Sequence, residues 1–169
     1  MNKIKNEGLS GFKPLVFGAI IFLVPCVGFG PFKDNQHSSL AGVEQMQVVV
    51  RIGLSRAGPT PQLLQEEVKK QLMEAGIHIV PVVDNDVPGS VPIFYVEVAV
   101  WQNGMKPYVY FVKADLYQTV QLDRKNGIKV YASTWQTSLI GEGTIERIRH
   151  DVSSVAKKFA VQYTVVNQG

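Results

Sequence analysis

Residues 45–80 read QMQVVVRIGLSRAGPTPQLLQEEVKKQLMEAGIHIV, and this stretch decides the fold class. Within 45–52, apolar residues alternate with mainly polar ones, which predicts a half-buried strand. Thr60 is a good N-cap for a helix, the proline after it suits the first helical position, and Gly76 suits the residue after the helix end. A short apolar run at 77–83, IHIVPVV, predicts a second strand. A strand, a helix and a strand over this length indicate a right-handed parallel crossover.

Three longer strand patterns follow, at 93–101, 108–122 and 129–139. Asn126-Gly127 lies between the last two and is a strong signal for a hairpin turn. We therefore expect these three strands to pair as an antiparallel meander. The two glycines of Gly141-Glu142-Gly143 are expected to break the third strand.

Two helix patterns are strongly one-sided. The first lies at 61–75, and the second begins after Thr144, a candidate N-cap, and spans about six turns at 3.6 residues each. The apolar stripes are Leu64, Val68, Leu72 and Ala75 in the first helix and Ile145, Ile148, Val152, Val155, Phe159, Tyr163 and Val166 in the second. Each stripe must lie against a sheet. We therefore predict an α/β (α+β) fold with element order β-α-β-β-β-β-α, in which a mixed five-stranded sheet has both helices packed on one face.

The amino terminus has the pattern of an export signal. Three lysines precede residues 14–30, a run of seventeen residues without a charge, and a basic head before an apolar run directs a chain to the membrane. Three outcomes remain open for residues 1–30: cleavage after small residues, retention as a membrane anchor, or lipid attachment at Cys26. Leu23 stands at the bacterial lipoprotein spacing from Cys26, whereas Pro25 occupies the position where those signals place a small residue.

Composition narrows the class of protein. We expect residues 31–42 to form a polar linker and 43–169 to form a single domain outside the cytoplasm, periplasmic or held at the membrane by the amino-terminal segment. The formal net charge is +3, but beyond residue 30 fourteen basic residues face thirteen acidic ones. Without a basic stripe, a nucleic-acid partner is not expected. Cys26 is the single cysteine, so the domain has no disulfide framework, thiol nucleophile or cysteine-based zinc site.

The motifs for catalysis or ligand binding are incomplete. Ser55 lies between a strand and a helix, as in a nucleophile elbow, but further loop residues separate it from the helix. Asp84-Asn85-Asp86 lacks the ligand spacing of a calcium loop, and Gly141-Glu142-Gly143-Thr144 lacks the glycine pattern of a phosphate site. We interpret His78 as a structural histidine and His150 as a partly exposed surface residue. No catalytic residue, metal site or cofactor is therefore expected.

Strand alternation places aromatic residues on the sheet face that the helices leave uncovered. If Val96 and Ala114 point toward the helices, their neighbours along each strand point away. The outward set contains five rings, Tyr95, Trp101, Tyr117, Tyr131 and Trp135. Large rings are enriched among the residues that dominate binding energy, so we predict that these five form part of a contact surface. A slip of one residue in strand register would turn them inward.

The element order, the sequence EAGI at 74–77 before the second strand and the long terminal helix resemble small exported bacterial α/β domains. Examples are the amino-terminal domain of TolB-like proteins and the envelope assembly lipoproteins related to CsgG, and the likeness covers most of residues 44–166. The resemblance implies an envelope location and a binding role, and it brings no catalytic residues. Our hypothesis is a non-catalytic domain that binds an envelope protein or associates with itself. The alternative is a carrier that holds a small ligand or lipid between the sheet and the helices.

Overall fold

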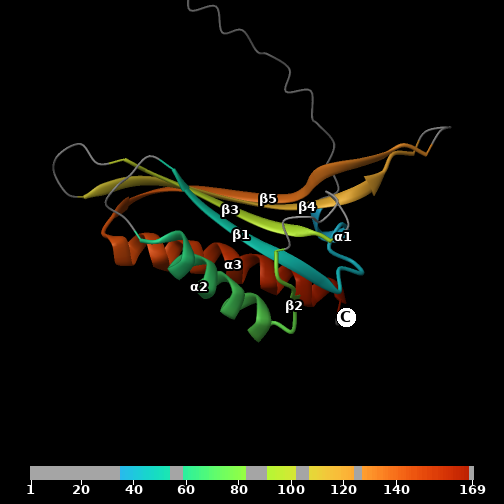
Figure 1. Cartoon of the computed structure of the whole chain (residues 1–169), viewed down its shortest axis with the longest axis horizontal. Coiled ribbons are helices and arrows are strands. Elements are labelled where there is room, and N and C mark those ends of the chain that lie inside the picture. The colour runs from blue at the N-terminus through green and yellow to red at the C-terminus, as the bar shows by residue number, and fades with distance from the viewer. Residues whose placement is uncertain (1–34, 54–58, 83–90, 102–106, 124–126, 168–169) are drawn as a thin grey trace, which may run out of the picture. The chain divides into compact units, whose positions relative to one another are not determined.

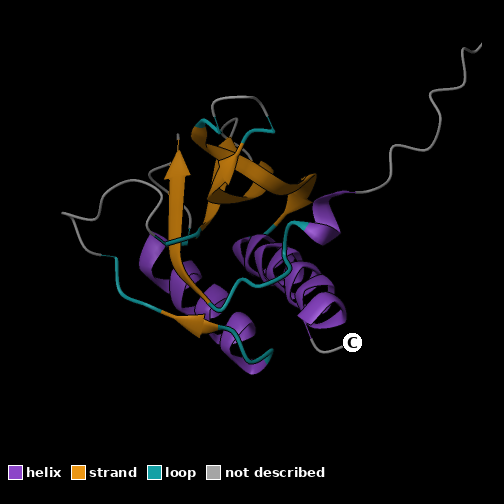
Figure 2. Cartoon of the chain, turned by 90° about the vertical axis from the view of Figure 1, so that its right-hand side faces the viewer, coloured by secondary structure: helices purple, strands orange, loops and turns teal. Residues whose placement is uncertain are grey.

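Five strands form one mixed sheet, and two long helices lie on the same side of it (Figures 1 and 2). This computed structural model describes residues 35–53, 59–82, 91–101, 107–123 and 127–167. The predicted export segment with Cys26, the loop serine Ser55 and the acidic run 84–86 lie outside the described residues. Within those residues, none of the helices combines the length and the apolar character that crossing a bilayer requires.

The sheet joins a parallel half to an antiparallel half. Its strands are β1 (Gln45–Gly53), β2 (His78–Ile79), β3 (Ile93–Trp101), β4 (Tyr108–Gln121) and β5 (Lys129–Gly143). The spatial order is β2-β1-β3-β4-β5. β1 runs parallel to both β2 and β3, whereas β3, β4 and β5 pair as an antiparallel meander. The predicted fold class, element order and parallel pairing of the first two strands are confirmed.

The two long helices begin and end where local sequence signals placed them. They are α2 (Pro61–Glu74) and α3 (Ile145–Asn167). Thr60 Oγ1 accepts a hydrogen bond from the Leu63 amide at 3.3 Å, which makes it the N-cap of α2. Gly76 follows the helix end with a φ of 83°, a conformation that glycine adopts without steric cost. Thr144 Oγ1 accepts from the Arg147 amide at 3.4 Å and caps α3 in the same way.

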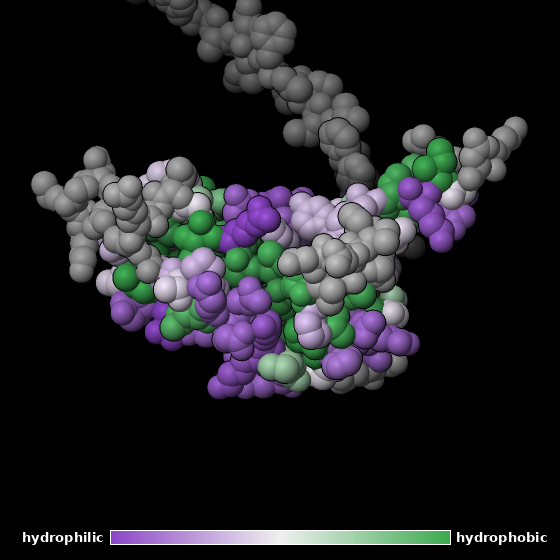
Figure 3. Space-filling view, viewed as in Figure 1, coloured by the Kyte–Doolittle hydropathy of each residue, from purple (hydrophilic) through white to green (hydrophobic). Residues whose placement is uncertain are grey.

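The core lies between the sheet and the helices. Hydrophobic residues appear in the band between the sheet and α2, and hydrophilic residues gather over the outer surface of the helices (Figure 3). Phe159 of α3 is at the centre, because its ring centroid lies 4.7 Å from that of Phe94 and 4.9 Å from that of Trp135. All three side chains are 2% exposed or less. These three rings occupy the centre of the space between the sheet and the helices, where the carrier hypothesis placed a ligand.

The predicted break at Gly141-Glu142-Gly143 is wrong, because β5 continues to Gly143. Gly141 pairs with Tyr110 across the ladder. A Cβ on Gly141 would lie 2.4 Å from the Tyr110 hydroxyl oxygen, so the tyrosine ring occupies the place of a side chain. The glycine serves close packing within a strand rather than the end of one.

The described part of the segment predicted as a linker packs on the domain. It contains a short helix, α1 (Asn35–Ser38), and Leu40 is fully buried in the core. Ser39 Oγ donates to the Thr134 carbonyl of β5 at 3.0 Å. A single leucine within a polar stretch has no periodicity, and for that reason the sequence gives no sign of this docking.

Candidate functional site

The outer face of the sheet, away from α2 and α3, carries a cluster of three tyrosines. The ring centroids of Tyr95 and Tyr117 lie 6.3 Å apart at an edge-on angle, and those of Tyr117 and Tyr131 lie 5.8 Å apart with nearly parallel planes. The Arg51 guanidinium lies 5.9 Å from the centroid of the Tyr95 ring, within cation–π range. We call these three rings the tyrosine cluster. It joins strands β3, β4 and β5 across the uncovered face.

A second group of apolar side chains lies nearer the β3–β4 connection. Trp101 pairs with Val109 across strands, and Phe111 pairs with Ile140. Trp101 is 47% exposed, Val109 46% and Ile140 79%. We call these four residues the apolar patch. Trp101 lies six residues beyond Tyr95 along β3, about 20 Å at 3.3 Å per residue, so it belongs to the patch rather than to the tyrosine cluster.

Charged residues separate the cluster from the patch. Arg51, Glu97 and Lys113 are neighbours across β1, β3 and β4. Lys113 Nζ lies 2.9 Å from an oxygen of Asp115, and Ser133 Oγ donates to the same carboxylate at 3.0 Å. The hydrogen bond with Asp115 raises the pKa of Lys113. The buried Asp115 is therefore paired, and the outer face combines aromatic, charged and apolar zones.

Trp135 does not belong to this face, so its predicted outward orientation is wrong. A β-bulge interrupts the β4–β5 ladder: Leu116 pairs with Trp135, but the next residue, Tyr117, pairs with Ser133. The extra residue, Thr134, reverses the alternation of β5. Trp135 consequently points toward the helices, where it is 2% exposed and its Nε1 donates to Gln162 Oε1 at 2.6 Å.

A buried polar network, which the sequence did not predict, lies between β4 and α3. Tyr110 points inward from β4, and its hydroxyl donates to Asp151 of α3 at 2.6 Å. Arg147 Nε lies 3.2 Å from the same carboxylate, and His150 Nδ1 lies 3.1 Å from it. Asp151 lies next to the apolar stripe of α3, so the sequence pattern of the helix does not predict that it is buried. Its burial follows from its contact with Tyr110, which depends on the position of β4 in the sheet. The predicted exposure of His150 is confirmed at 70% of its side chain, whereas His78 is exposed on β2 rather than structural.

Opposing effects set the protonation of this network. Burial alone would raise the pKa of the Asp151 carboxyl, but the hydrogen bonds with Tyr110 and His150 and the charge of Arg147 outweigh it and hold that pKa below its ordinary value. Burial and the Asp151 hydrogen bond raise the pKa of the Tyr110 hydroxyl. The pair is therefore a neutral phenol that donates to a carboxylate at neutral pH.

Asp151→Asn is expected to lower the free energy of unfolding by about 1.5–3 kcal/mol at neutral pH, because a charged hydrogen-bonded group is lost. A lowered folded-state pKa contributes stability above the unfolded value, near 3.9, and that stability disappears as pH falls through the folded value. The difference between wild type and variant should therefore narrow from about pH 5 to about pH 2 in urea unfolding curves. The exposed Asp123→Asn is the control. A constant difference for Asp151→Asn across this range would contradict the coupling.

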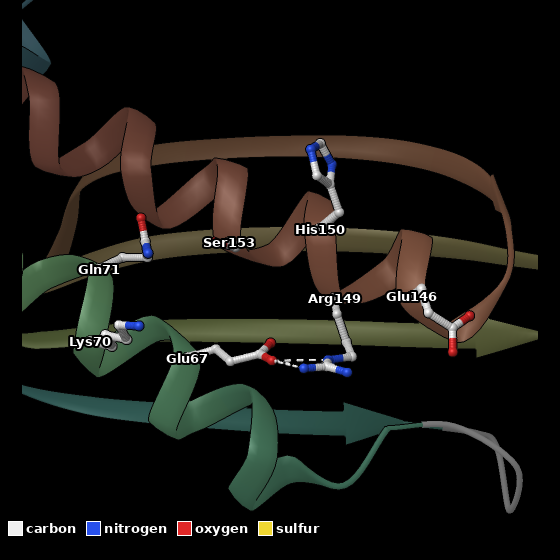
Figure 4. A pocket seen from close by; sticks show the side chains of 7 residues that line it. All are labelled: Glu67, Lys70, Gln71, Glu146, Arg149, His150 and Ser153. Carbon is white, nitrogen blue, oxygen red and sulfur yellow. Dashed lines mark hydrogen bonds and ion pairs between the residues drawn. The ribbon is translucent and has the colours of Figure 1, made fainter.

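A polar groove lies between α2 and α3, with a volume of about 350 Å³. Glu67 of α2 and Arg149 of α3 form an ion pair in it (Figure 4, dashed lines). In the same view His150 projects from the opposite side of α3, away from that pair. The hydrogen bonds with Glu67 raise the pKa of Arg149. Arg149 and Glu67, which face each other across this groove, are therefore paired with each other.

No family model and no curated protein matches the chain. Solved structures with a similar arrangement include a PelC variant dodecamer from Paraburkholderia phytofirmans, which is 15% identical with a TM-score of 0.39 over 72% of this chain and 86% of that chain. A minor lipoprotein from Acinetobacter baumannii is 10% identical, with a TM-score of 0.33 over 73% and 93%. The rare lipoprotein B from Shewanella oneidensis is 11% identical, with a TM-score of 0.30 over 69% and 89%. Two of these proteins bear the name lipoprotein.

Proposed function

We propose that this chain is an exported, non-catalytic domain of the cell envelope that binds a protein partner through the outer face of its sheet. The observation that carries the proposal is the unequal covering of the two faces. Two helices bury the inner face, while Trp101, Val109 and Ile140 of the outer face remain between 46% and 79% exposed. Apolar side chains that form one large contiguous patch on a monomer usually mark an interaction site, and Trp101, Val109 and Ile140 lie together on one face.

The chemistry of this face suits a protein partner. Tyrosine and tryptophan rings remove a large area from water, and they lose little conformational entropy because they have few rotatable bonds. Arg51, Glu97 and Lys113 lie between the tyrosine cluster and the apolar patch, and such charges select among partners and fix their orientation. Aromatic residues are enriched and charged residues are depleted in the cores of protein interfaces, so the tyrosine cluster and the apolar patch are the two parts of this face that suit a buried contact.

The buried network supports a structural rather than a catalytic role. Tyr110 is fully buried, and its hydroxyl is already committed to Asp151. A general acid or base must come within hydrogen-bond reach of a substrate, which this hydroxyl does not do. The export part of the proposal rests on the lysine-headed apolar run of residues 1–30.

The proposal is tested by photo-crosslinking in intact cells that produce the full chain. A benzophenone amino acid replaces Trp101 or Tyr131 on the outer face, and in matched controls it replaces Met73 of α2 or Val165 of α3, which are 53% and 67% exposed. We expect discrete protein adducts from the two outer-face positions and none at the same masses from the helix positions. Adducts from the helix positions alone, or identical adducts from all four, would refute binding through this face.

A further inference from the structure

Strand β5 is an edge strand, and among the described residues β4 is its only neighbour in the sheet. It extends from Lys129 to Gly143, fifteen residues, well beyond the usual strand length of five or six. The outer backbone groups of an edge strand attract other strands, so folded proteins cover or disrupt such edges.

The middle of the β5 edge is covered by the segment around α1. The Gln136 amide donates to the Gln36 side chain at 3.2 Å, and Ser39 donates to the Thr134 carbonyl at 3.0 Å. The β-bulge at the same point twists the ladder. Covering and bulge both lie before residue 137.

The second half of the edge, Thr137–Gly143, remains open. Since the Gln136 amide points to the edge, the alternation of an antiparallel strand directs the backbone N–H and C=O of Ser138, Ile140 and Glu142 to the same edge. Within the described residues, no hydrogen bond reaches these six backbone groups. Ile140, at their centre, is 79% exposed.

We propose that two copies of this chain pair through this open half, with Thr137–Gly143 of each copy antiparallel about a two-fold axis at Ile140. Ile140 then lies opposite Ile140 of the second copy, and Ser138 lies opposite Glu142. The two sheets join into one continuous sheet. This inference goes beyond the proposed function, because it uses the edge of the sheet rather than its face and stands independently of any other partner.

The segment is self-complementary in this register. Ser138, Ile140 and Glu142 each donate one hydrogen bond to the second copy and accept one from it, which satisfies every open group on the edge. Glu142 faces Ser138 of the second copy, so no like charges lie directly opposite each other. On the inner face, Leu139 lies opposite Gly141, which has no side chain to obstruct it.

The covered part of the edge does not obstruct this pairing. Gln136 of the second copy would lie opposite Thr144, one residue past the end of β5, so the α1 segment of each copy lies beyond the paired region. On the outer face the two Ile140 side chains meet, and each is flanked across β4 by Phe111. The apolar patches of both copies thereby merge at the two-fold axis, as an isologous dimer requires.

The first experiment crosslinks Ile140→Cys in the full chain, in membranes, with a short bis-maleimide reagent. In a hydrogen-bonded antiparallel pair the two Cα atoms lie about 5.5 Å apart, so a covalent dimer is expected at least tenfold above that of two controls. The first control is the wild-type chain, which shows how much dimer forms through Cys26. The second is Val109→Cys, which places a thiol on the same face but away from the edge, at a position where the valine is 46% exposed. A dimer yield equal to that of Val109→Cys overturns the proposal.

The second experiment tests the register by co-producing Ser138→Cys and Glu142→Cys chains that carry tags of different size. The proposed register places Ser138 of one copy opposite Glu142 of the other. It separates the two Ser138 residues from each other by four residues along the strand, about 13 Å. Random pairing of equal amounts of the two chains gives a mixed dimer at twice the yield of each homodimer. We expect the mixed dimer to exceed this twofold ratio clearly, and a ratio of 1:2:1 would overturn the register. Loss of the adducts at Trp101 and Tyr131 with these crosslinks retained would refute the proposed function alone.

Discussion

Phe159→Ala is expected to lower the free energy of unfolding by about 3–5 kcal/mol. Phe159 is fully buried, and its ring contacts the rings of Phe94 and Trp135, with Tyr163 stacked at 6.5 Å on the same helix. The substitution removes the transfer free energy of the ring and leaves a cavity between sheet and helix. The loss is a large share of the roughly 5–15 kcal/mol that stabilises a domain.

The measurement is urea unfolding of wild type and variant, followed by circular dichroism at a fixed pH. Val165→Ala on the same helix is the matched control, because Val165 is 67% exposed and its truncation should change stability by no more than about 0.5 kcal/mol. If Phe159→Ala behaved like this control, α3 would not dock on the sheet through Phe159.

Trp135→Ala should cost about as much, 3–5 kcal/mol. The indole packs on Phe94 and Phe159 and donates its N–H to Gln162. Truncation therefore removes a ring from the core and leaves a polar side chain without its partner. This large effect depends on the β-bulge, because without the extra residue Thr134 the indole would point to solvent.

Tyr131→Ala provides the matched comparison four residues earlier on the same strand. Tyr131 is 38% exposed and stacks on Tyr117, and such a ring pair contributes about 0.5–1.5 kcal/mol beyond its buried area. The Trp135 variant should therefore lose clearly more stability than the Tyr131 variant in the same urea series. Equal losses would mean that the two rings share a face and that the ladder continues without a bulge.

Apart from α1, the sequence by itself determined the helices and strands and their order. The helix limits follow from contacts within one turn: Thr60 and Thr144 cap amides three residues ahead, and Gly76 takes a positive φ after the helix end. Strand positions follow from alternation along the chain, and α3 buries most of its predicted stripe. These signals depend on residues that are close in sequence, so they can be recognised without knowledge of the fold.

Only the tertiary structure decided which side chains meet. The bulge adds one residue, Thr134, to β5 and so reverses the alternation of the strand. Trp135 therefore lies in the core rather than on the predicted surface. A glycine such as Gly141 is typical of a strand break. Here it lies within a strand, because the Tyr110 ring of the neighbouring strand occupies the space that a side chain would need. An aspartate such as Asp151 is typical of a helix surface, but it is buried here because it accepts a hydrogen bond from Tyr110 of the sheet.

The physical reason is the same in each case. Capping and alternation are set by contacts between residues a few positions apart. A bulge, a ring over a glycine and a buried carboxylate depend on residues that lie between 16 and 41 positions apart along the chain. The tyrosine cluster shows both levels: alternation alone turned its three rings outward, but the register across β3, β4 and β5 brought them together and separated Trp101 from them.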